Sequence, residues 1–219
     1  KLSYEKPEEN YESLRDTSSK VLNSIVSNNE FIIGGSADLF SSTKTYINDL
    51  GDFSSKNYLG KNIFFGVREH AMAAIINGIS LVGFRSYAST FLAFSDYMRP
   101  AMRLAAILNL PVTYIFTHDS ISIGSDGATH QPVEQLTSLR AMPNLEVFRP
   151  CDANEVIGTY KTIMKKKFGP SVISLSKTKL PILEKTSSSG VEKGAYSVKN
   201  EQRKLDGIII SSGEEVHQA

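Results

Sequence analysis

Residue types that can bind or transform a ligand follow four apolar runs in this sequence of 219 residues. They include glycines, acids, histidines, hydroxyl side chains and a lysine, and they occupy residues 34–38, 66–70, 117–120 and 176–177. In an open parallel α/β sheet, ligands bind beyond the carboxyl ends of the strands. If the apolar runs are such strands, the polar residues gather at one edge of the sheet. The sequence therefore predicts a functional site at this edge.

The first two groups also have structural interpretations that the residues alone leave open. A glycine pair after a strand serves any backbone that needs a positive φ, so Gly34 and Gly35 are compatible with a plain turn. Arg68 and Glu69 at the start of a helix can simply complement the helix dipole. These groups indicate a site only when they are taken together with the others.

His118 and Asp119 admit two further interpretations. The two side chains can form a satisfied structural pair, and the addition of Asp126 and His130 can suggest a metal site. No compact ligand spacing of a known type is present, so the pattern gives the metal site little support.

Three aromatic residues, Phe91, Phe94 and Tyr97, recur every third position. On a helix this spacing places them on neighbouring positions of one face. The spacing alone favours packing in a core over a ligand pocket.

The elements that must position these residues alternate along the chain. Short runs rich in apolar residues predict strands at 31–33, 63–65, 112–116, 145–148 and 171–175, and a further short strand is predicted at 84–88. Helical spacing predicts helices from Pro7 to Val26 and over 69–81, 91–108, 133–141 and 153–166, with a break near Pro100. This order predicts an α/β fold with a doubly wound, mainly parallel sheet and helices on both faces.

A change of composition near residue 185 predicts a domain boundary. Residues 184–193 are rich in serine and have the composition of a linker. Beyond them, 206–212 is predicted to be a strand and 214–219 the first turn of a helix. We therefore expect one domain over 1–185, followed over 186–219 by a linker and the start of a second α/β domain.

Composition limits the classes of partner. Lysine and arginine number 24 against 23 acidic residues, which leaves a net charge of +1 and no indication of nucleic acid or anionic membrane binding. Apolar stretches such as 75–84 are too short and interrupted to span a bilayer, and no secretory pattern opens the chain. The single cysteine, Cys151, excludes an intramolecular disulfide and fits a reducing compartment, so we expect a cytoplasmic location.

Four ordered segments together carry a family resemblance. They are GGSADL, GVREHAMAAI, STFLAFSDY and THDSISIGSDGATHQPVEQL. From about Arg15 to Val198 the chain resembles the middle, pyrimidine-binding domain of the transketolases, and its end resembles the start of their C-terminal domain. The resemblance implies a transferase that uses thiamine diphosphate and magnesium or calcium to move a two-carbon ketol unit from a ketose phosphate to an aldose phosphate.

The resemblance assigns cofactor-binding roles to five of these residues. It implies that Glu69 hydrogen-bonds N1′ of the aminopyrimidine and favours the imino tautomer that removes the proton from thiazolium C2. It implies an aromatic pocket of Phe91, Phe94 and Tyr97 around the pyrimidine, in place of core packing. Asp38 is expected to contact the cofactor or to support a site that forms across subunits.

Substrate-binding roles follow from the same resemblance. His118 and His130 resemble the histidines that contact the sugar hydroxyls and the reacting oxygen. Asp126 resembles the carboxylate that selects the hydroxyl configuration at the second carbon of the donor. Such hydrogen-bonding groups discriminate strongly, because a missing substrate hydroxyl leaves them unpaired.

Phosphate binding is implied for Arg15 and Ser42, since a guanidinium and a hydroxyl suit a dianionic phosphate. The chain departs from the family at Lys177, which stands where an arginine is usual and offers a point charge in place of a planar fork. A second departure is Ala128, where a proline commonly stands.

The family divides its active site between domains and subunits. Its diphosphate and metal are held by a separate N-terminal domain through an acidic GDG-type segment that is absent from these residues. We therefore expect a homodimer or partner chain to complete the site, and an inactive chain in isolation. Alternatives are a deoxyxylulose phosphate synthase, a 2-oxo acid dehydrogenase β subunit, a dihydroxyacetone synthase or a non-catalytic assembly module.

Overall fold

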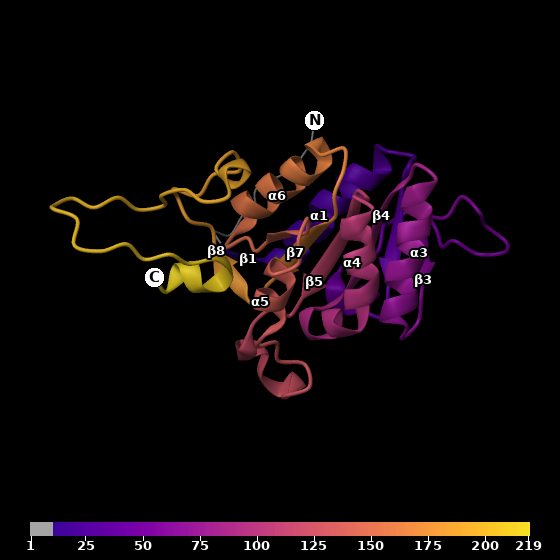
Figure 1. The fold of residues 1–219 in the computed structure, drawn as a ribbon, viewed down its shortest axis with the longest axis horizontal. Coiled ribbons are helices and arrows are strands. Elements are labelled where there is room, and N and C mark those ends of the chain that lie inside the picture. The colour runs from indigo at the N-terminus through magenta and orange to yellow at the C-terminus, as the bar shows by residue number, and fades with distance from the viewer. Residues whose placement is uncertain (1–10) are drawn as a thin grey trace.

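The chain folds around a parallel β-sheet. A computed structural model describes residues 11–219, and the predicted helical residues 7–10 lie outside the described range. The sheet has six parallel strands in the order β3-β2-β4-β5-β7-β6 (Figure 1). The strands are β2 (Ile32–Ser36), β3 (Asn62–Phe64), β4 (Arg85–Phe91), β5 (Val112–Thr117), β6 (Glu146–Phe148) and β7 (Ser171–Leu175). The predicted α/β fold is confirmed.

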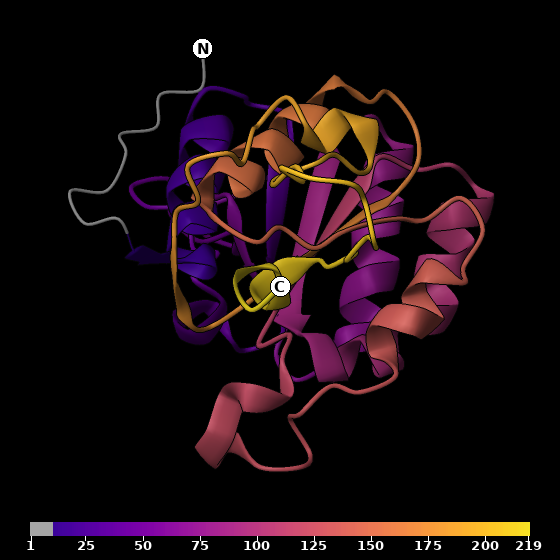
Figure 2. The same cartoon turned by 90° about the vertical axis from the view of Figure 1, so that its left-hand side faces the viewer.

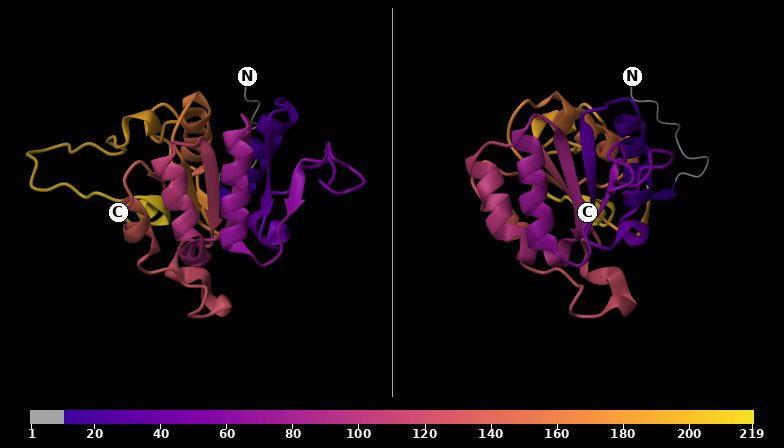
Figure 3. Two further views of the ribbon diagram at one scale, coloured as in Figure 1. Left: turned by 45° about the vertical axis from the view of Figure 1, so that its right-hand side comes forward. Right: turned by 90° about the vertical axis from the view of Figure 1, so that its right-hand side faces the viewer.

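Helices cover both faces of this sheet (Figures 2 and 3). One face carries α1 (Leu14–Ser27) and α6 (Ala153–Lys165), and the other carries α3 (Glu69–Leu81), α4 (Arg99–Ile107) and α5 (Gln135–Arg140). Successive strand residues point to opposite faces. Thus Tyr114 and Phe116 of β5 lie in the core under α3 and α4, while Ile115 lies in the core under α1 and α6. The sheet is doubly wound, as predicted.

The helices form where the sequence supplies an apolar stripe and a start signal. In α1, the side chains of Val21, Leu22, Ile25 and Val26 are buried against the sheet. In α6, the side chain of Asp152 caps the first turn by accepting a hydrogen bond from the backbone N–H of Glu155 at 3.0 Å. Among residues 11–219, no helix is both long and apolar enough to cross a membrane.

The glycine pair lies inside β2, so the predicted strand 31–33 continues to Ser36. A Cβ atom built on Gly35 would lie 1.9 Å from the backbone oxygen of Ile63, and one on Gly34 would lie 2.3 Å from that of Tyr87. Close approach of neighbouring strands therefore requires both glycines, and neither a turn nor a ligand contact is needed to explain them.

The predicted helix over 91–108 is divided in three. Phe91 ends β4, the 3₁₀ helix η1 spans Leu92–Met98, and α4 begins at Arg99. Pro100 lies in the first turn of α4, where its missing N–H has no intrahelical partner to lose. The aromatic triplet is thus not on one regular α-helix, as its spacing suggested.

A small antiparallel sheet was not predicted. It pairs β1 (Tyr11–Ser13) with β8 (Lys179–Pro181). Residues 11–13 are therefore strand, and α1 begins later than the helical pattern indicated. The pairing joins the beginning of the described chain to the segment that follows β7, and it places Arg15 in the first turn of α1.

The predicted strand over 206–212 is wrong. Ile208, Ile209 and Ile210 are 76%, 77% and 90% exposed, and no described segment pairs with their backbone. A strand needs such a partner for its N–H and C=O groups. The predicted helical turn after it is the 3₁₀ helix η4 (Gly213–His217). The expected boundary near 185 remains a prediction. Thr186, just beyond it, donates a hydrogen bond to Asp152 at the start of α6, so the two sides of the expected boundary are in contact.

Candidate active site

The carboxyl ends of the parallel strands meet at one edge of the sheet. The register places Phe91 at the end of β4 beside Thr117 of β5, and Thr117 beside Leu175 of β7. Two strands away from Phe91, β3 ends at Phe64 and leads through a short turn into α3. The sequence motifs that follow these strands therefore lie along one edge, as their order along the chain predicted.

Glu69 is the first residue of α3 and is only 8% exposed. No residue in the described range donates a hydrogen bond to its carboxyl group. The positive end of the helix dipole favours an acidic group at this position. The carboxyl oxygens can therefore accept a hydrogen bond from a ligand N–H. Its position makes it available for a ligand nitrogen.

Phe91 and Phe94 form a stacked pair, with ring centroids 5.7 Å apart and an interplanar angle of 18°. Phe91 is 7% exposed, yet it belongs to neither of the two hydrophobic cores. Tyr97 lies 6.2 Å from Phe94 and is 65% exposed. We call Phe91 and Phe94 the aromatic wall. Its position outside both cores favours a ligand surface over core packing.

Both predicted histidines contact the aromatic wall. The ring of His118 lies 3.8 Å from that of Phe91, and the ring of His130 lies 5.1 Å from that of Phe94 in an edge-on arrangement. His118 adopts a φ of 60°, which is uncommon outside glycine, and Nδ1 lies 2.8 Å from the Thr117 hydroxyl. This hydrogen bond fixes the ring and directs Nε2 to the other side.

Charged groups surround His118 on that other side. Nε2 lies 3.9 Å from Oδ2 of Asp126, and the same oxygen accepts a hydrogen bond from Nζ of Lys177 at 3.2 Å. Burial, followed by the positive charges of Lys177 and Arg15, lowers the pKa of His118 to about 4. The hydrogen bond from Lys177 lowers the pKa of Asp126. At neutral pH the site contains a neutral imidazole beside a carboxylate and a lysine.

Of the remaining predicted residues, Arg15 and Ser42 are in contact, whereas Asp38 stands apart from the other candidates. Arg15 donates from Nη1 to the backbone oxygen of Ser42 at 2.8 Å, so the two phosphate-binding candidates meet through the main chain rather than the serine hydroxyl. Nε of Arg15 is buried and has no partner in the described range. Asp38 follows β2 with a φ of 64° and is exposed, and no contact joins it to the other candidates within that range.

The metal interpretation of the histidine loop finds no support. Residues 11–219 contain no group of three or more histidines, cysteines, aspartates or glutamates that could hold a metal ion. Asp119 turns away from His118, and its Oδ2 accepts hydrogen bonds from Arg149 at 2.9 Å and Ser174 at 3.1 Å. Asp119 is thus a structural residue.

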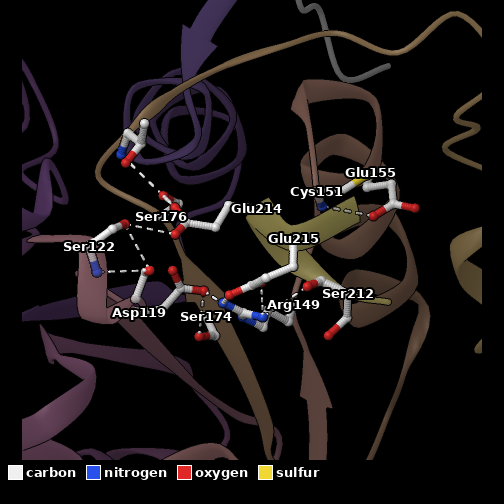
Figure 4. A network of polar contacts seen from close by, with 12 residues as sticks. Asp119, Ser122, Arg149, Cys151, Glu155, Ser174, Ser176, Ser212, Glu214 and Glu215 are labelled. Atoms are coloured by element: carbon white, nitrogen blue, oxygen red, sulfur yellow. Dashed lines mark hydrogen bonds and ion pairs between the residues drawn. The ribbon is translucent and has the colours of Figure 1, made fainter. Parts of the chain in front are cut away.

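Two residues that the sequence did not indicate, Arg149 and Glu214, bind residues next to the predicted site (Figure 4). Arg149 holds Asp119 and directly follows β6, so the rule of inspecting each strand end identifies it. Glu214 accepts hydrogen bonds from Ser122 and Ser176 but lies 38 residues beyond the latter. No local pattern marks it.

Comparisons with known proteins agree with this geometry. Residues 12–182 match the family described as transketolase, pyrimidine binding domain. Over 207 residues the chain is 51% identical to the transketolase of Bacillus subtilis, covering 92% of this chain and 31% of that protein. The corresponding identity to the Aquifex aeolicus transketolase is 47% over 221 residues, covering 98% and 32%. The chain thus spans about a third of the length of these curated relatives.

Solved structures show the same relationship. A Pichia stipitis transketolase in complex with sedoheptulose 7-phosphate superposes with a TM-score of 0.93 at 41% identity, covering 99% of this chain and 33% of that chain. A split-gene transketolase described as an inactive β4 tetramer has a TM-score of 0.63 at 29% identity, covering 78% and 53%. The chain belongs to the family of transketolase pyrimidine-binding domains.

Proposed function

We propose that this chain supplies the pyrimidine-side half of a transketolase active site. The reaction is transfer of a two-carbon ketol unit from a ketose phosphate to an aldose phosphate. The observation that carries this proposal is the position of Glu69, a buried carboxyl group without a partner in the described range, at the same sheet edge as the aromatic wall and His118.

The residues fit the aminopyrimidine of thiamine diphosphate. Phe91 and Phe94 offer stacked rings outside both cores, which suits a flat heterocycle. Glu69 offers a carboxyl group that can share a proton with a ring nitrogen. When bound, thiamine diphosphate supplies the electron sink for breaking and forming the carbon–carbon bond.

The chain's own residues then have separable roles. Glu69 holds a proton between its carboxyl oxygen and N1′ of the pyrimidine. Phe91 and Phe94 exclude water from that hydrogen bond, which strengthens it because the local dielectric is low. Exclusion of water also prevents competing proton transfers.

The polar side of the site suits the sugar phosphate. His118 is neutral at physiological pH, and Thr117 fixes its ring, so Nε2 can exchange a hydrogen bond with a sugar hydroxyl or with the reacting oxygen. Asp126 can accept from a donor hydroxyl. Arg15 and Lys177 both lie close enough to His118 to lower its pKa, and together they offer positive charge for a phosphate group.

The rest of the active site lies outside this chain in our proposal. A diphosphate-binding domain of the same protein or of a partner chain holds the diphosphate and its magnesium or calcium ion, and the intact protein is a homodimer. The chain alone is then inactive.

The test is transketolase turnover with xylulose 5-phosphate and ribose 5-phosphate in the full-length protein, with any partner chain, thiamine diphosphate and magnesium. We expect sedoheptulose 7-phosphate from the unaltered protein and about a 10²- to 10⁴-fold lower rate from Glu69→Gln, the usual loss on removing a general acid or base. Glu30→Gln is the matched control, because Glu30 is exposed and remote from the site. No product from the unaltered protein, or equal rates for both variants, contradicts the proposal.

A further inference from the structure

The 3₁₀ helix η4 is attached to Ser122, Arg149 and Ser176, residues that follow β5, β6 and β7 (Figure 4). Arg149 joins η4 to Asp119, because its Nε donates to Asp119 at 2.9 Å while its Nη2 donates to Glu215 of η4 at 3.1 Å. His217 at the end of η4 lies 2.8 Å from the backbone oxygen of Cys151 through Nε2. Two separate contacts therefore fix this turn in place.

Glu214, between these anchors, is only 8% exposed and its side chain is occupied on both oxygens. Oε1 accepts a hydrogen bond from the hydroxyl of Ser122 at 2.9 Å, and Oε2 accepts one from Ser176 at 2.6 Å. Burial alone would raise the pKa of Glu214, but hydrogen bonds from Ser120, Ser176 and Ser122 outweigh it and lower the pKa. Glu214 is a carboxylate at neutral pH.

The partners of Glu214 lie next to the substrate-binding candidates in the chain. Ser122 is in the 3₁₀ helix η2 (Ile121–Asp126), which ends at Asp126. Ser176 immediately precedes Lys177. The contact between Asp126 and Lys177 at 3.2 Å therefore joins the same two segments that the Glu214 carboxylate joins.

Besides these contacts, η2 is held at its start by the buried Ser120, whose hydroxyl accepts a hydrogen bond from the backbone N–H of Ser122 at 3.1 Å. None of its residues is buried, and its backbone turns at Gly124 with a φ of 72° and at Gly127 with a φ of 82°. Without apolar burial, the position of such a loop depends on its polar contacts. The side chain of Gln131, which donates to the backbone oxygen of Ile121 at 3.0 Å, provides a second contact within the loop but none to the sheet edge.

We propose that Glu214 is a positioning residue. It holds η2, which ends at Asp126, against residues 176–177 and so sets the geometry of the donor sugar site. The segment beyond the predicted domain boundary thereby determines the shape of a site built by the preceding domain. The assignment to a sugar site rests on the proposed function, whereas the attachment of the loop does not.

Two measurements on the full-length protein test the proposal separately. The first is amide hydrogen exchange, compared between Glu214→Ala, Ser122→Ala and the control Glu30→Ala. We expect amides over 121–127 to exchange about tenfold faster in the first two variants, with Tm and the exchange of β5 unchanged, because a charged hydrogen bond of this kind is lost. Glu214→Gln should restore most of the protection, since the serine hydroxyls can rotate to suit an amide.

The second measurement is the split between kcat and KM for the donor ketose phosphate. Glu214→Ala should raise the donor KM about tenfold while kcat and the affinity for thiamine diphosphate change less than about twofold. Unchanged loop exchange, or faster exchange throughout the protein, overturns the positioning role. Faster exchange of residues 121–127 with an unchanged donor KM overturns the link to the sugar site. Absence of turnover in the unaltered full-length protein contradicts the proposed function instead.

Discussion

The two sides of the candidate site are held by different forces. On the aromatic side, Phe91 ends a central strand and Glu69 begins a helix, so regular elements packed on an apolar core fix both. On the polar side, Asp126 lies at the end of a 3₁₀ helix without buried residues and is held by Lys177 and, through Ser122, by Glu214. Burial sets the first side and electrostatics the second, so different perturbations should affect each.

The largest effect on stability is expected on the aromatic side. Phe91→Ala removes a ring that is 7% exposed, and we expect the free energy of unfolding to fall by about 3–5 kcal/mol, as for other buried phenylalanines. The matched control is Tyr97→Ala, whose ring is 65% exposed and whose loss should change stability by about 0.5 kcal/mol at most. Denaturant titration measures both. Equal losses would mean that the aromatic wall is not held by burial.

A somewhat smaller effect is expected from His118 and depends on pH. Because the fold lowers its pKa from 6.5 to about 4, the unfolded chain binds the proton more readily between these values. The stability contribution of the neutral ring is complete above pH 6.5 and is lost as the pH falls through 6.5 toward 4. The loss is on the order of 3 kcal/mol, since each unit of pKa corresponds to about 1.4 kcal/mol.

The measurement is the free energy of unfolding of the unaltered protein and of His118→Gln at several pH values from 7 to 4. As the pH falls, the free energy of unfolding should decrease more for the unaltered protein than for His118→Gln. Parallel curves would show that His118 titrates normally and that the polar side does not exclude its charged form.

The smallest effect is expected from Asp126, whose carboxylate is partly exposed. Asp126→Asn keeps the shape but removes the charge that pairs with Lys177, so we expect the donor KM to rise about tenfold while Tm stays unchanged. Asp49→Asn, on an exposed loop, should alter neither quantity. A fall in Tm for Asp126→Asn alone would show that the contact with Lys177 stabilises the whole fold and does not only position the loop.

Much of the fold was predictable because burial leaves a local pattern. Runs rich in apolar and β-branched residues, such as 112–116, identified the central strands, and α3 begins and ends where its sequence predicted. The pairing of β1 with β8 was not predictable, since it joins residues about 170 positions apart and involves few apolar side chains. The run Ile208–Ile209–Ile210 was misread because β propensity cannot show whether a partner strand is available.

The candidate site, like the fold, contains residues that local sequence patterns predict and residues that they do not. The rule that ligands bind beyond strand ends brought Glu69, His118 and Lys177 together from sequence alone. The same rule applied to Arg149 would have found the residue that holds Asp119. Glu214 could not be found, because its role depends on where a distant turn packs in three dimensions. The roles of the site residues stay predictions.

The most direct test of the central claim is the rate of deuterium exchange at C2 of thiamine diphosphate bound to the full-length protein. Glu69 is the group in this chain to which we assign the proton at the pyrimidine nitrogen, so Glu69→Gln should slow this exchange by about 100-fold or more while Glu30→Gln leaves it unchanged. Equal exchange rates for Glu69→Gln and the unaltered protein would contradict the account.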